Sequence, residues 1–394
     1  MNRRDFVLSL PLLFSGKLLA APASPARFLL VFLRGGYDAA NVLVPISASY
    51  YYDMRPNIAI PRAAALPVDS DWGLHPALAE SLFPLYEKRE VAFIPFAGTH
   101  DTSRSHFETQ DSIELGQPTG KALEAAPNAS TRTYASGFMN RLAAELGGRG
   151  AISFTNQLPV AFRGTAQVAN VALNIAAKPG VDERQSRLIA QMYAGNALGT
   201  QVTEGFAARD AVMRDLGDEM VAASRNAVTA RAFETQAQRV AKLMRSDYRL
   251  GFVDVGGWDT HVGEGGAQGY LATRLDELGR GLAAFATAMG DAWRDTVVLV
   301  VSEFGRTFRE NGNRGTDHGH GTVYWALGGA LRGGRVAGEQ LRVARDTLFQ
   351  DRDYPVLNEY RALLGALFGR LYGLDKDALA RIFPGAAPED LALL

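Results

Sequence analysis

The sequence predicts an α/β protein in which a mostly parallel sheet is flanked by helices. Short apolar runs alternate with segments of helical periodicity along most of the 394 residues, a pattern typical of strands joined by crossover helices. The runs are apolar throughout, as expected of strands that are buried on both faces. At about 150 residues per domain, the length allows two or three domains or one large domain with an insertion. We expect a single domain over 27–394.

The strand candidates follow one another in a regular order. Residues 27–33 form an apolar run that leads into Gly35-Gly36, and 296–301 is the strongest candidate because every residue is β-branched or leucine. With a helix at 76–88, the runs at 27–33 and 91–95 form a β-α-β succession, for which a right-handed crossover is the default. Further strands are expected at 151–154, 168–173, 251–255 and 323–328.

The helical periodicity is clearest at 270–289, where apolar residues recur every three or four positions. Another helix is expected at 358–372. The periodicity also dominates 182–193 and the polar, alanine-rich stretch 204–246. We interpret about 180–246 as a helical insertion in the α/β body and 117–131 as an exposed loop.

Composition excludes several kinds of function. The chain has 41 basic and 42 acidic residues, so no positive charge excess attracts it to nucleic acid or anionic lipid. Cysteine is absent, which excludes disulfides, thiolate metal sites and cysteine nucleophiles. Only six histidines are present, so the position of each is informative.

Residues 1–26 have the layout of an export signal. The pair Arg3-Arg4 precedes an apolar stretch at 6–20, and Ala21-Pro22-Ala23 offers a small-residue cleavage pattern. The arginine pair resembles the twin-arginine signal, which implies the twin-arginine export machinery as a partner and a periplasmic or other extracytoplasmic location. The alternative interpretation is an amphipathic helix with two chance arginines. The stretch is too short and too polar to span a membrane, so the mature chain is expected to be soluble.

The rare polar residues gather after strands. Ligand sites of parallel sheets lie at the carboxyl ends of strands, and five of the six histidines fall in three segments of that kind, each with an acid nearby. Asp38 follows the first strand, and Glu303 ends the strand at 296–301. The three segments contribute His100, Asp101, Ser103, Ser105 and His106; Asp254, Asp259 and His261; and Asp317, His318 and His320.

Carboxylates and imidazoles at one sheet edge are suitable ligands for zinc, manganese, iron or magnesium. Each residue also has a structural interpretation: a glycine turn for Asp38 and a loop cap for His261. For the segment 317–320 the alternative is a solvated turn. For His75, which precedes Pro76, capping or packing is the favoured interpretation.

Five blocks of the sequence resemble the exported family called domain of unknown function 1501, and the resemblance spans nearly the whole chain. That family is similar in layout to the alkaline-phosphatase superfamily, which includes sulfatases and cofactor-independent phosphoglycerate mutases. The resemblance implies an alkaline-phosphatase-like fold, with metal ions at the carboxyl edge of the sheet and a Ser, Thr or modified Cys that attacks a phosphate or sulfate ester. The blocks are 32–41, 74–78, 105–111, 257–261 and 302–307.

The resemblance also implies ligands. Asp38 corresponds to the first-strand aspartate ligand, and Asp259 with His261 to an aspartate–histidine pair, although one residue separates them where the superfamily usually has three. Glu303 stands where an Asp-His pair is expected, and Phe304 replaces its histidine. Either another histidine fills the missing position, or one metal binds, or catalysis is lost. The late histidine ligand is His318 or His320, and His106 is a further candidate for the missing position.

The resemblance also implies a nucleophile position at Ser105, with Thr102 and Ser103 as alternatives. A guanidinium fork matches a phosphate or sulfate group, and Arg306 is the best placed clamp, with Arg34 and Arg104 as others. A surface role for Arg306 is the competing interpretation.

Two hypotheses follow for the function. The first is an exported metal-dependent hydrolase-like protein that acts on a phosphate or sulfate ester. The second is a non-catalytic envelope protein that keeps the fold for binding or assembly, which the replacement by Phe304 favours.

Overall fold

The chain is described by a computed structural model, which covers residues 26–119, 132–173, 192 and 232–394. A nine-stranded sheet has the order β11-β5-β10-β9-β1-β8-β6-β7, and β12 also pairs with β5. The strand pairs are parallel except those that β10 makes with β5 and β9. The mostly parallel sheet predicted from the sequence is confirmed. The strands are β1 (Arg27–Leu33), β5 (Val91–Gly98), β6 (Ala151–Ser153), β7 (Val168–Asn170), β8 (Leu250–Val255), β9 (Thr296–Ser302), β10 (Thr322–Leu327), β11 (Arg335–Val336) and β12 (Asn358–Glu359).

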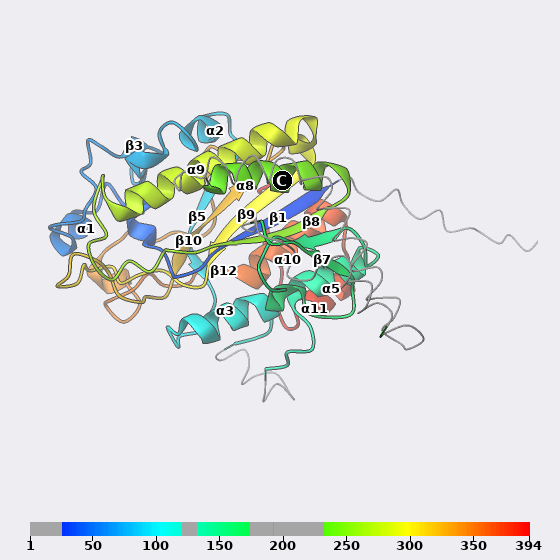
Figure 1. The fold of residues 1–394 in the computed structure, drawn as a ribbon. Helices are drawn as coiled ribbons and strands as arrows, with labels where there is room; N and C mark the ends of the chain where they lie inside the picture. The colour runs from blue at the N-terminus through cyan, green and yellow to red at the C-terminus, as the bar shows by residue number, and fades with distance from the viewer. Residues whose placement is uncertain (1–25, 120–131, 174–191, 193–231) are drawn as a thin grey trace, which may run out of the picture.

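Helices cover both faces of this sheet (Figure 1). One face carries α2 (Phe83–Glu87), α8 (Ala232–Ser246) and α9 (Tyr270–Met289); the other carries α3 (His106–Leu115), α5 (Phe138–Glu145), α10 (Tyr360–Tyr372) and α11 (Lys376–Ile382). Helix α1 (Ser49–Met54) and a small sheet of β2 (Leu43–Val44), β3 (Leu66–Pro67) and β4 (Gly73–Leu74) lie beside them. Short 3-10 helices are η1 (Ala39–Asn41), η2 (Pro76–Leu78), η3 (Val160–Phe162), η5 (Gly290–Asp295) and η6 (Arg345–Thr347).

Each central strand sends alternate side chains to opposite faces, which divides the core in two. In β1, Leu29 and Val31 join the core under α8 and α9, whereas Leu30 and Phe32 join the core under α10. Since a fully buried side chain of this kind contributes about 1.5–3 kcal/mol of transfer free energy, both cores hold β1 at the centre of the molecule. This position fixes the direction in which its carboxyl end points.

The predicted elements agree with the structure, with three local differences. The helix expected at 76–88 is divided into η2 and α2, because Pro84 has no N–H to donate and lies in the first turn of a new helix that begins at Phe83. The helix expected at 358–372 begins at Tyr360, since Asn358 and Glu359 pair with β5 instead. The strand expected at 168–173 ends at Asn170.

Strands β1 and β5, which the sequence predicts as a β-α-β succession, run in the same direction in one sheet, but they are not neighbours because β9 and β10 lie between them. The neighbours of β1 are β8 and β9, and the antiparallel β10 pairs with both β9 and β5.

The helix predicted at 270–289 is confirmed as α9. The stretch 204–246 is helical over α8. The other residues assigned to the insertion lie outside the described part of the chain, as do residues 1–25 of the expected signal and 120–131 of the expected loop. Among the residues that the structure describes, no helix has the length and apolar character needed to cross a membrane.

Candidate metal centre

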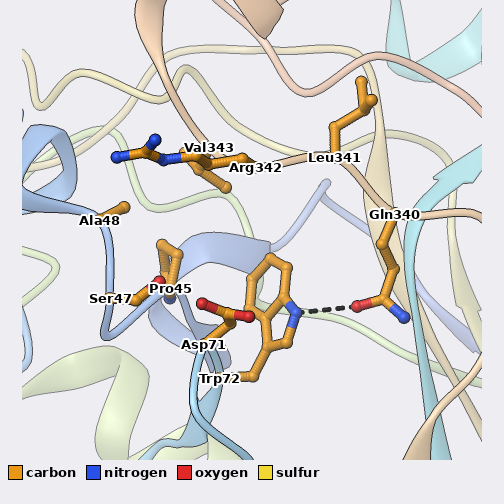
Figure 2. Close-up of a pocket in the computed structure, with 9 residues that line it drawn as sticks. All are labelled: Pro45, Ser47, Ala48, Asp71, Trp72, Gln340, Leu341, Arg342 and Val343. Carbon is orange, nitrogen blue, oxygen red and sulfur yellow. Dashed lines mark hydrogen bonds between the residues drawn. The ribbon is translucent and has the colours of Figure 1, made fainter.

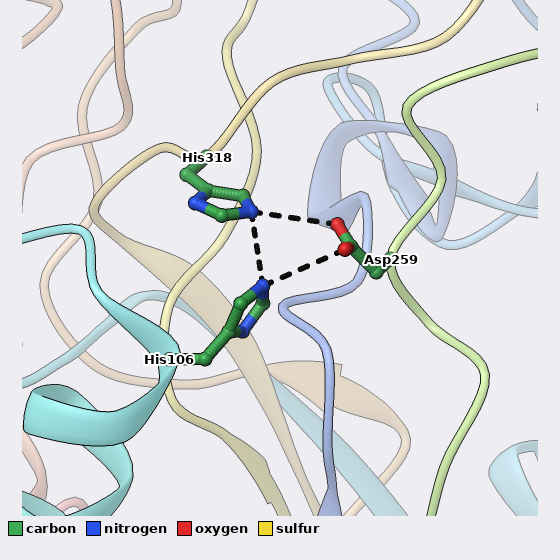
Figure 3. Close-up of side chains that lie close together, drawn as sticks. All are labelled: His106, Asp259 and His318. Carbon is green, nitrogen blue, oxygen red and sulfur yellow. Dashed lines mark hydrogen bonds and ion pairs between the residues drawn. The ribbon is translucent and has the colours of Figure 1, made fainter.

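Loops that follow β5, β8 and β9 bring four side chains together at the carboxyl edge of the sheet. His106 begins α3 after β5, Asp259 and His261 follow β8, and His318 lies in the loop between β9 and β10. We refer to these four residues as the histidine centre. Figure 3 shows three of them, with His106 and His318 facing Asp259.

Donor atoms of His106, Asp259 and His318 all lie within 4.8 Å of one another, and His261 adjoins this group. The Nε2 of His318 lies 2.9 Å from that of His106 and 3.1 Å from that of His261. Asp259 Oδ1 lies 3.0 Å from His261 Nε2 and 3.5 Å from His318 Nε2, and Oδ2 lies 3.6 Å from His106 Nε2. The side chains are 24–44% exposed, so solutes can reach the centre.

Each histidine is held by its other ring nitrogen. His106 Nδ1 lies 2.8 Å from Glu303 Oε1, and His261 Nδ1 lies 3.2 Å from Asp317 Oδ1. His318 Nδ1 lies 3.0 Å from the carbonyl oxygen of Arg104. Since carboxylates and carbonyls only accept, neutral rings of His106 and His318 carry their proton on Nδ1 and present a lone pair at Nε2. His261 has a carboxylate oxygen beside each ring nitrogen, Asp317 Oδ1 at Nδ1 and Asp259 Oδ1 at Nε2.

This arrangement leaves acceptors facing acceptors. The Nε2 lone pairs of His106 and His318 lie 2.9 Å apart beside the Asp259 carboxylate, and acceptors this close repel unless a positive charge lies between them. A proton on one ring can be donated to a single neighbour, whereas a cation would contact His106, Asp259 and His318 together. A second set of acceptors that orients each imidazole is the usual environment of metal-bound histidine.

Glu303 orients His106, and most lone pairs of its carboxylate already accept hydrogen bonds from the protein. Its Oε1 accepts from His106 Nδ1, Gln110 Nε2 and the Gly35 amide, each at 2.8 Å, and its Oε2 accepts from Ser302 Oγ at 3.0 Å. Burial would raise the pKa of Glu303, but the hydrogen bonds from His106 and Gln110 outweigh burial and lower it. The carboxylate is therefore ionised and fully engaged with the protein.

The loop after β9 places His318 by folding back on itself. Thr307 donates its amide to the carbonyl of Asp317, and Gly319 donates to the carbonyl of Gly305, both at 2.9 Å. A Cβ on Gly319 would lie 2.5 Å from a backbone atom of Arg306, so only glycine allows this close approach. Gly35, with φ of +125°, approaches the Asp259 backbone in the same way.

Arg306 orients the carboxylate of the histidine centre. Its Nη1 donates to Asp259 Oδ1 at 2.6 Å, and its Nη2 donates to the carbonyl of Thr316 at 2.6 Å. Partial burial would raise the pKa of Asp259, but the hydrogen bond and charge of Arg306 outweigh it and lower that pKa. Because the Arg306 side chain is 0% exposed, it holds Asp259 and does not reach solvent.

A family model described as "Protein of unknown function (DUF1501)" matches residues 25–383. The chain belongs to the DUF1501 family. No curated protein matches its sequence.

Solved structures similar to this DUF1501 protein include a protein of the alkaline phosphatase superfamily from Vibrio parahaemolyticus, at 12% identity and a TM-score of 0.36. That match covers 78% of this chain and 62% of the other, so the chain spans less than two thirds of its length. A 2-O GAG sulfatase, BT1596, is similar at 9% identity and a TM-score of 0.41, over 93% of this chain and 76% of that one. A putative sulfatase from Bacteroides thetaiotaomicron has the same four values.

Asp38 is not brought to the histidine centre of the DUF1501 protein. Its buried carboxylate is paired with both terminal nitrogens of Arg55, and Arg55 Nη2 lies 2.9 Å from Asp38 Oδ1. Asn41 and Tyr51 complete this group, and the Tyr51 hydroxyl donates to Asn41 Oδ1 at 2.6 Å. With Glu264, which hydrogen-bonds Asp38, we refer to these five residues as the buried acid cluster.

Two other histidines are separate from the centre. His320 is buried against the ring of Phe349, and burial lowers its pKa to about 4, with help from the charge of Arg104. His75 caps η2, as expected, because its Nδ1 accepts from the Ala77 amide at 3.0 Å. Neither side chain points at the convergent Nε2 atoms.

The remaining predicted residues hold α3 against the sheet. Ser105 is its N-cap, and the Ser105 Oγ accepts from the Glu108 amide at 3.5 Å. Arg34 donates to Asp254 at 2.7 Å and lies 2.9 Å from Glu114 of α3. Arg104 donates to the buried Asp353 at 2.6 Å, and its φ of +53° directs its carbonyl to His318.

Sequence reasoning missed Arg55 and Glu264. Glu264 lies three residues after His261 in the loop that follows β8. The rule that acids after strands are candidate site residues therefore also applies to Glu264. Arg55 ends α1, outside the β-α-β pattern, and nothing in the sequence pairs it with Asp38.

A separate cavity of about 330 Å³ lies between the segments 45–48, 71–72 and 340–343. Figure 2 shows Trp72 on its wall, where the indole N–H donates to Gln340 Oε1 at 2.9 Å. None of its lining residues belongs to the histidine centre.

Proposed function

We propose that this protein is an exported, metal-dependent hydrolase-like protein in which the histidine centre holds one divalent cation and a phosphate or sulfate ester is cleaved beside it. The observation that carries the proposal is the group of donor atoms from His106, Asp259 and His318 that all lie within 4.8 Å of one another, with His261 beside Asp259 and His318. A single ion is favoured over two because Asp38 is paired with Arg55 and the oxygens of Glu303 are engaged. Three imidazoles favour zinc or iron over magnesium.

The donor geometry fits such an ion. Four ligands at about 2.0–2.1 Å from a tetrahedral zinc lie about 3.3 Å from one another. The close donor pairs of the histidine centre are separated by 2.9–3.6 Å. His106, Asp259 and His318 therefore require little rearrangement to hold the ion, and His261 adjoins them through Asp259 and His318.

A bound cation would act as a Lewis acid at an ester oxygen. The chain itself supplies the orientation: Glu303 fixes the ring of His106, and Arg306 fixes the carboxylate of Asp259. We assign the nucleophile position to Ser105, which is next to His106 and is half-buried, with its hydroxyl held only by the long contact to Glu108.

Metal content tests the centre directly. We expect the purified wild-type chain to retain one equivalent of a divalent metal by mass spectrometry, and His318→Ala to lose it, because His318 contacts every other donor. The control is His100→Ala, which removes an exposed histidine after the same strand as His106. Retention of the metal in His318→Ala would overturn the ligand assignment.

Ester cleavage tests the reaction. The metal-loaded wild type is assayed with nitrophenyl phosphate and nitrocatechol sulfate, beside Ser105→Ala and Ser103→Ala. We expect hydrolysis in the wild type and Ser103→Ala, and loss in Ser105→Ala with unchanged metal content. Equal activity in Ser105→Ala would remove this residue from the mechanism.

The number of ligands favours a second candidate function, in which the metal stabilises a binding or assembly protein and takes part in no reaction. Four protein donors close a tetrahedral site, as in structural metal centres, whereas catalytic centres keep one position open. A metal-loaded wild type that cleaves neither ester class would support a metal-stabilised binding or assembly protein instead.

Export is proposed from the sequence of 1–26 alone. The arginine pair, the apolar stretch and the small-residue exit support transport by the twin-arginine machinery. Replacing Arg3 and Arg4 together with lysine is expected to retain the protein in the cytoplasm, as shown by cell fractionation. Unchanged export would contradict this assignment.

A further inference from the structure

A buried carboxyl group joins the two loops that carry most of the histidine centre. Glu264 is 0% exposed, and its Oε2 accepts from the hydroxyls of Thr260 and Thr316, both at 2.9 Å. Thr260 lies between Asp259 and His261, and Thr316 lies two residues before His318. One oxygen atom thus connects loops that are more than fifty residues apart.

The backbone of the two loops supports the same connection. The Thr316 amide donates to the Thr260 carbonyl at 3.0 Å, and the Glu264 amide donates to the Arg314 carbonyl at 2.9 Å. Thr316 also accepts from Arg306 through its hydroxyl at 3.3 Å and its carbonyl at 2.6 Å. Arg306 in turn donates to Asp259. Glu264 is therefore connected to Asp259 in two ways, through the neighbouring Thr260 and through Thr316 with Arg306.

The connection does not require a negative charge on Glu264. Burial and the nearby charge of Asp38 raise the pKa of Glu264 well above its usual range, so the carboxyl is neutral and can donate to Asp38. Its Oε1 lies 3.4 Å from Asn41 Nδ2. A glutamine can therefore accept from both threonines and donate to Asp38.

We propose that Glu264 is a positioning residue for the histidine centre, because its carboxyl fastens the loops 257–264 and 314–318 in the arrangement that brings Asp259, His261 and His318 together. The inference rests on the proposed metal binding. Ligands held in place before binding lose less conformational freedom when the ion arrives, and removal of groups that orient metal ligands typically weakens metal affinity about 10–100-fold.

The test is a titration of the metal-free full-length chain with Zn²⁺, followed by calorimetry, in wild type, Glu264→Gln, Glu264→Leu and Thr316→Val. We expect Glu264→Gln to bind Zn²⁺ close to the wild-type affinity, and Glu264→Leu and Thr316→Val to bind about 10–100-fold more weakly. Thr316→Val keeps the shape of the side chain and keeps the measurement informative if Glu264→Leu does not fold.

Thr296→Val is the matched control, since Thr296 is equally buried but begins β9 at the opposite edge of the sheet. Unfolding by urea is measured for each variant, and a general packing defect predicts equal losses of metal affinity in Thr296→Val and Thr316→Val. Wild-type affinity in Thr316→Val or Glu264→Leu would overturn the inference while the proposed metal site stands. Absence of Zn²⁺ binding by the wild type would overturn both.

Discussion

The histidine centre and the buried acid cluster lie near one another at the same edge of the sheet, yet they differ in one respect. In the buried acid cluster, acceptors meet donors: Arg55 donates to Asp38, and Tyr51 donates to Asn41. In the histidine centre, imidazole nitrogens meet one another, since His318 Nε2 lies 2.9 Å from that of His106 and 3.1 Å from that of His261. Residue composition alone would make either group a metal site. The balance of donors and acceptors shows that the buried acid cluster is complete, and it makes the histidine centre the candidate for a cation.

Removal of Arg55 tests whether the buried acid cluster is structural. Arg55→Met leaves Asp38 buried without its cation and removes the donor to the Phe308 carbonyl. Breaking a buried pair in this way costs about 3–5 kcal/mol. We expect a loss of this size in the free energy of urea unfolding.

The metal content of folded Arg55→Met is expected to equal that of the wild type. Arg370→Met, at an exposed pair with Asp390, is the control and should cost about 1 kcal/mol or less. A variant that loses the metal but keeps its stability would assign the buried acid cluster to the metal site.

The pH dependence of His75 tests the same distinction for a histidine that the protein satisfies by itself. Its Nε2 lies 3.1 Å from the Gly266 carbonyl, and burial lowers its pKa from 6.5 to about 4. Because the folded state resists protonation, this contribution to stability is complete above pH 6.5 and is lost as the pH falls toward 4. The loss amounts to about 3 kcal/mol at pH 4.

The measurement compares urea unfolding at pH 7 and pH 4 in wild type and His75→Asn, with a chelator in every sample. We expect a smaller decrease in the variant, in which asparagine can still accept from the Ala77 amide. Equal decreases would show that another group carries the acid sensitivity.

Metal addition is expected to produce the smallest of these changes in the free energy of unfolding. A ligand at about 100 times its Kd stabilises the folded state by about 2.7 kcal/mol. We expect Zn²⁺ to raise the unfolding midpoint of the wild type and not that of His318→Ala, and a chelator to reverse the increase. An equal increase in both proteins would place the stabilising ion elsewhere.

Much of the fold could be predicted because the strands are long apolar runs. The segments at 27–33, 251–255 and 296–301 became the centre of the sheet, and the rule that polar residues after strands share an edge located the histidine centre. The position of β10 could not be predicted, since its antiparallel insertion depends on pairing between distant segments.

The sequence named all four residues of the histidine centre as candidates but could not separate them from Asp38, Glu303 and His320. All seven follow strands, and what distinguishes them is the partner that each side chain meets. The partners of Asp38 and Glu303 are Arg55 from α1 and Gln110 from α3, and both come from outside the strand ends. Such pairings depend on tertiary packing, which local patterns do not record.

The donors of the histidine centre extend from residue 106 to residue 318 and come from three separate loops. No shorter portion of the chain brings them together, so an ion held there would be acquired only after the sheet has assembled. On the proposed function, metal loading would then be a late step of maturation. For a protein exported in its folded state, the metal supply of the compartment in which folding finishes would decide which ion the protein carries.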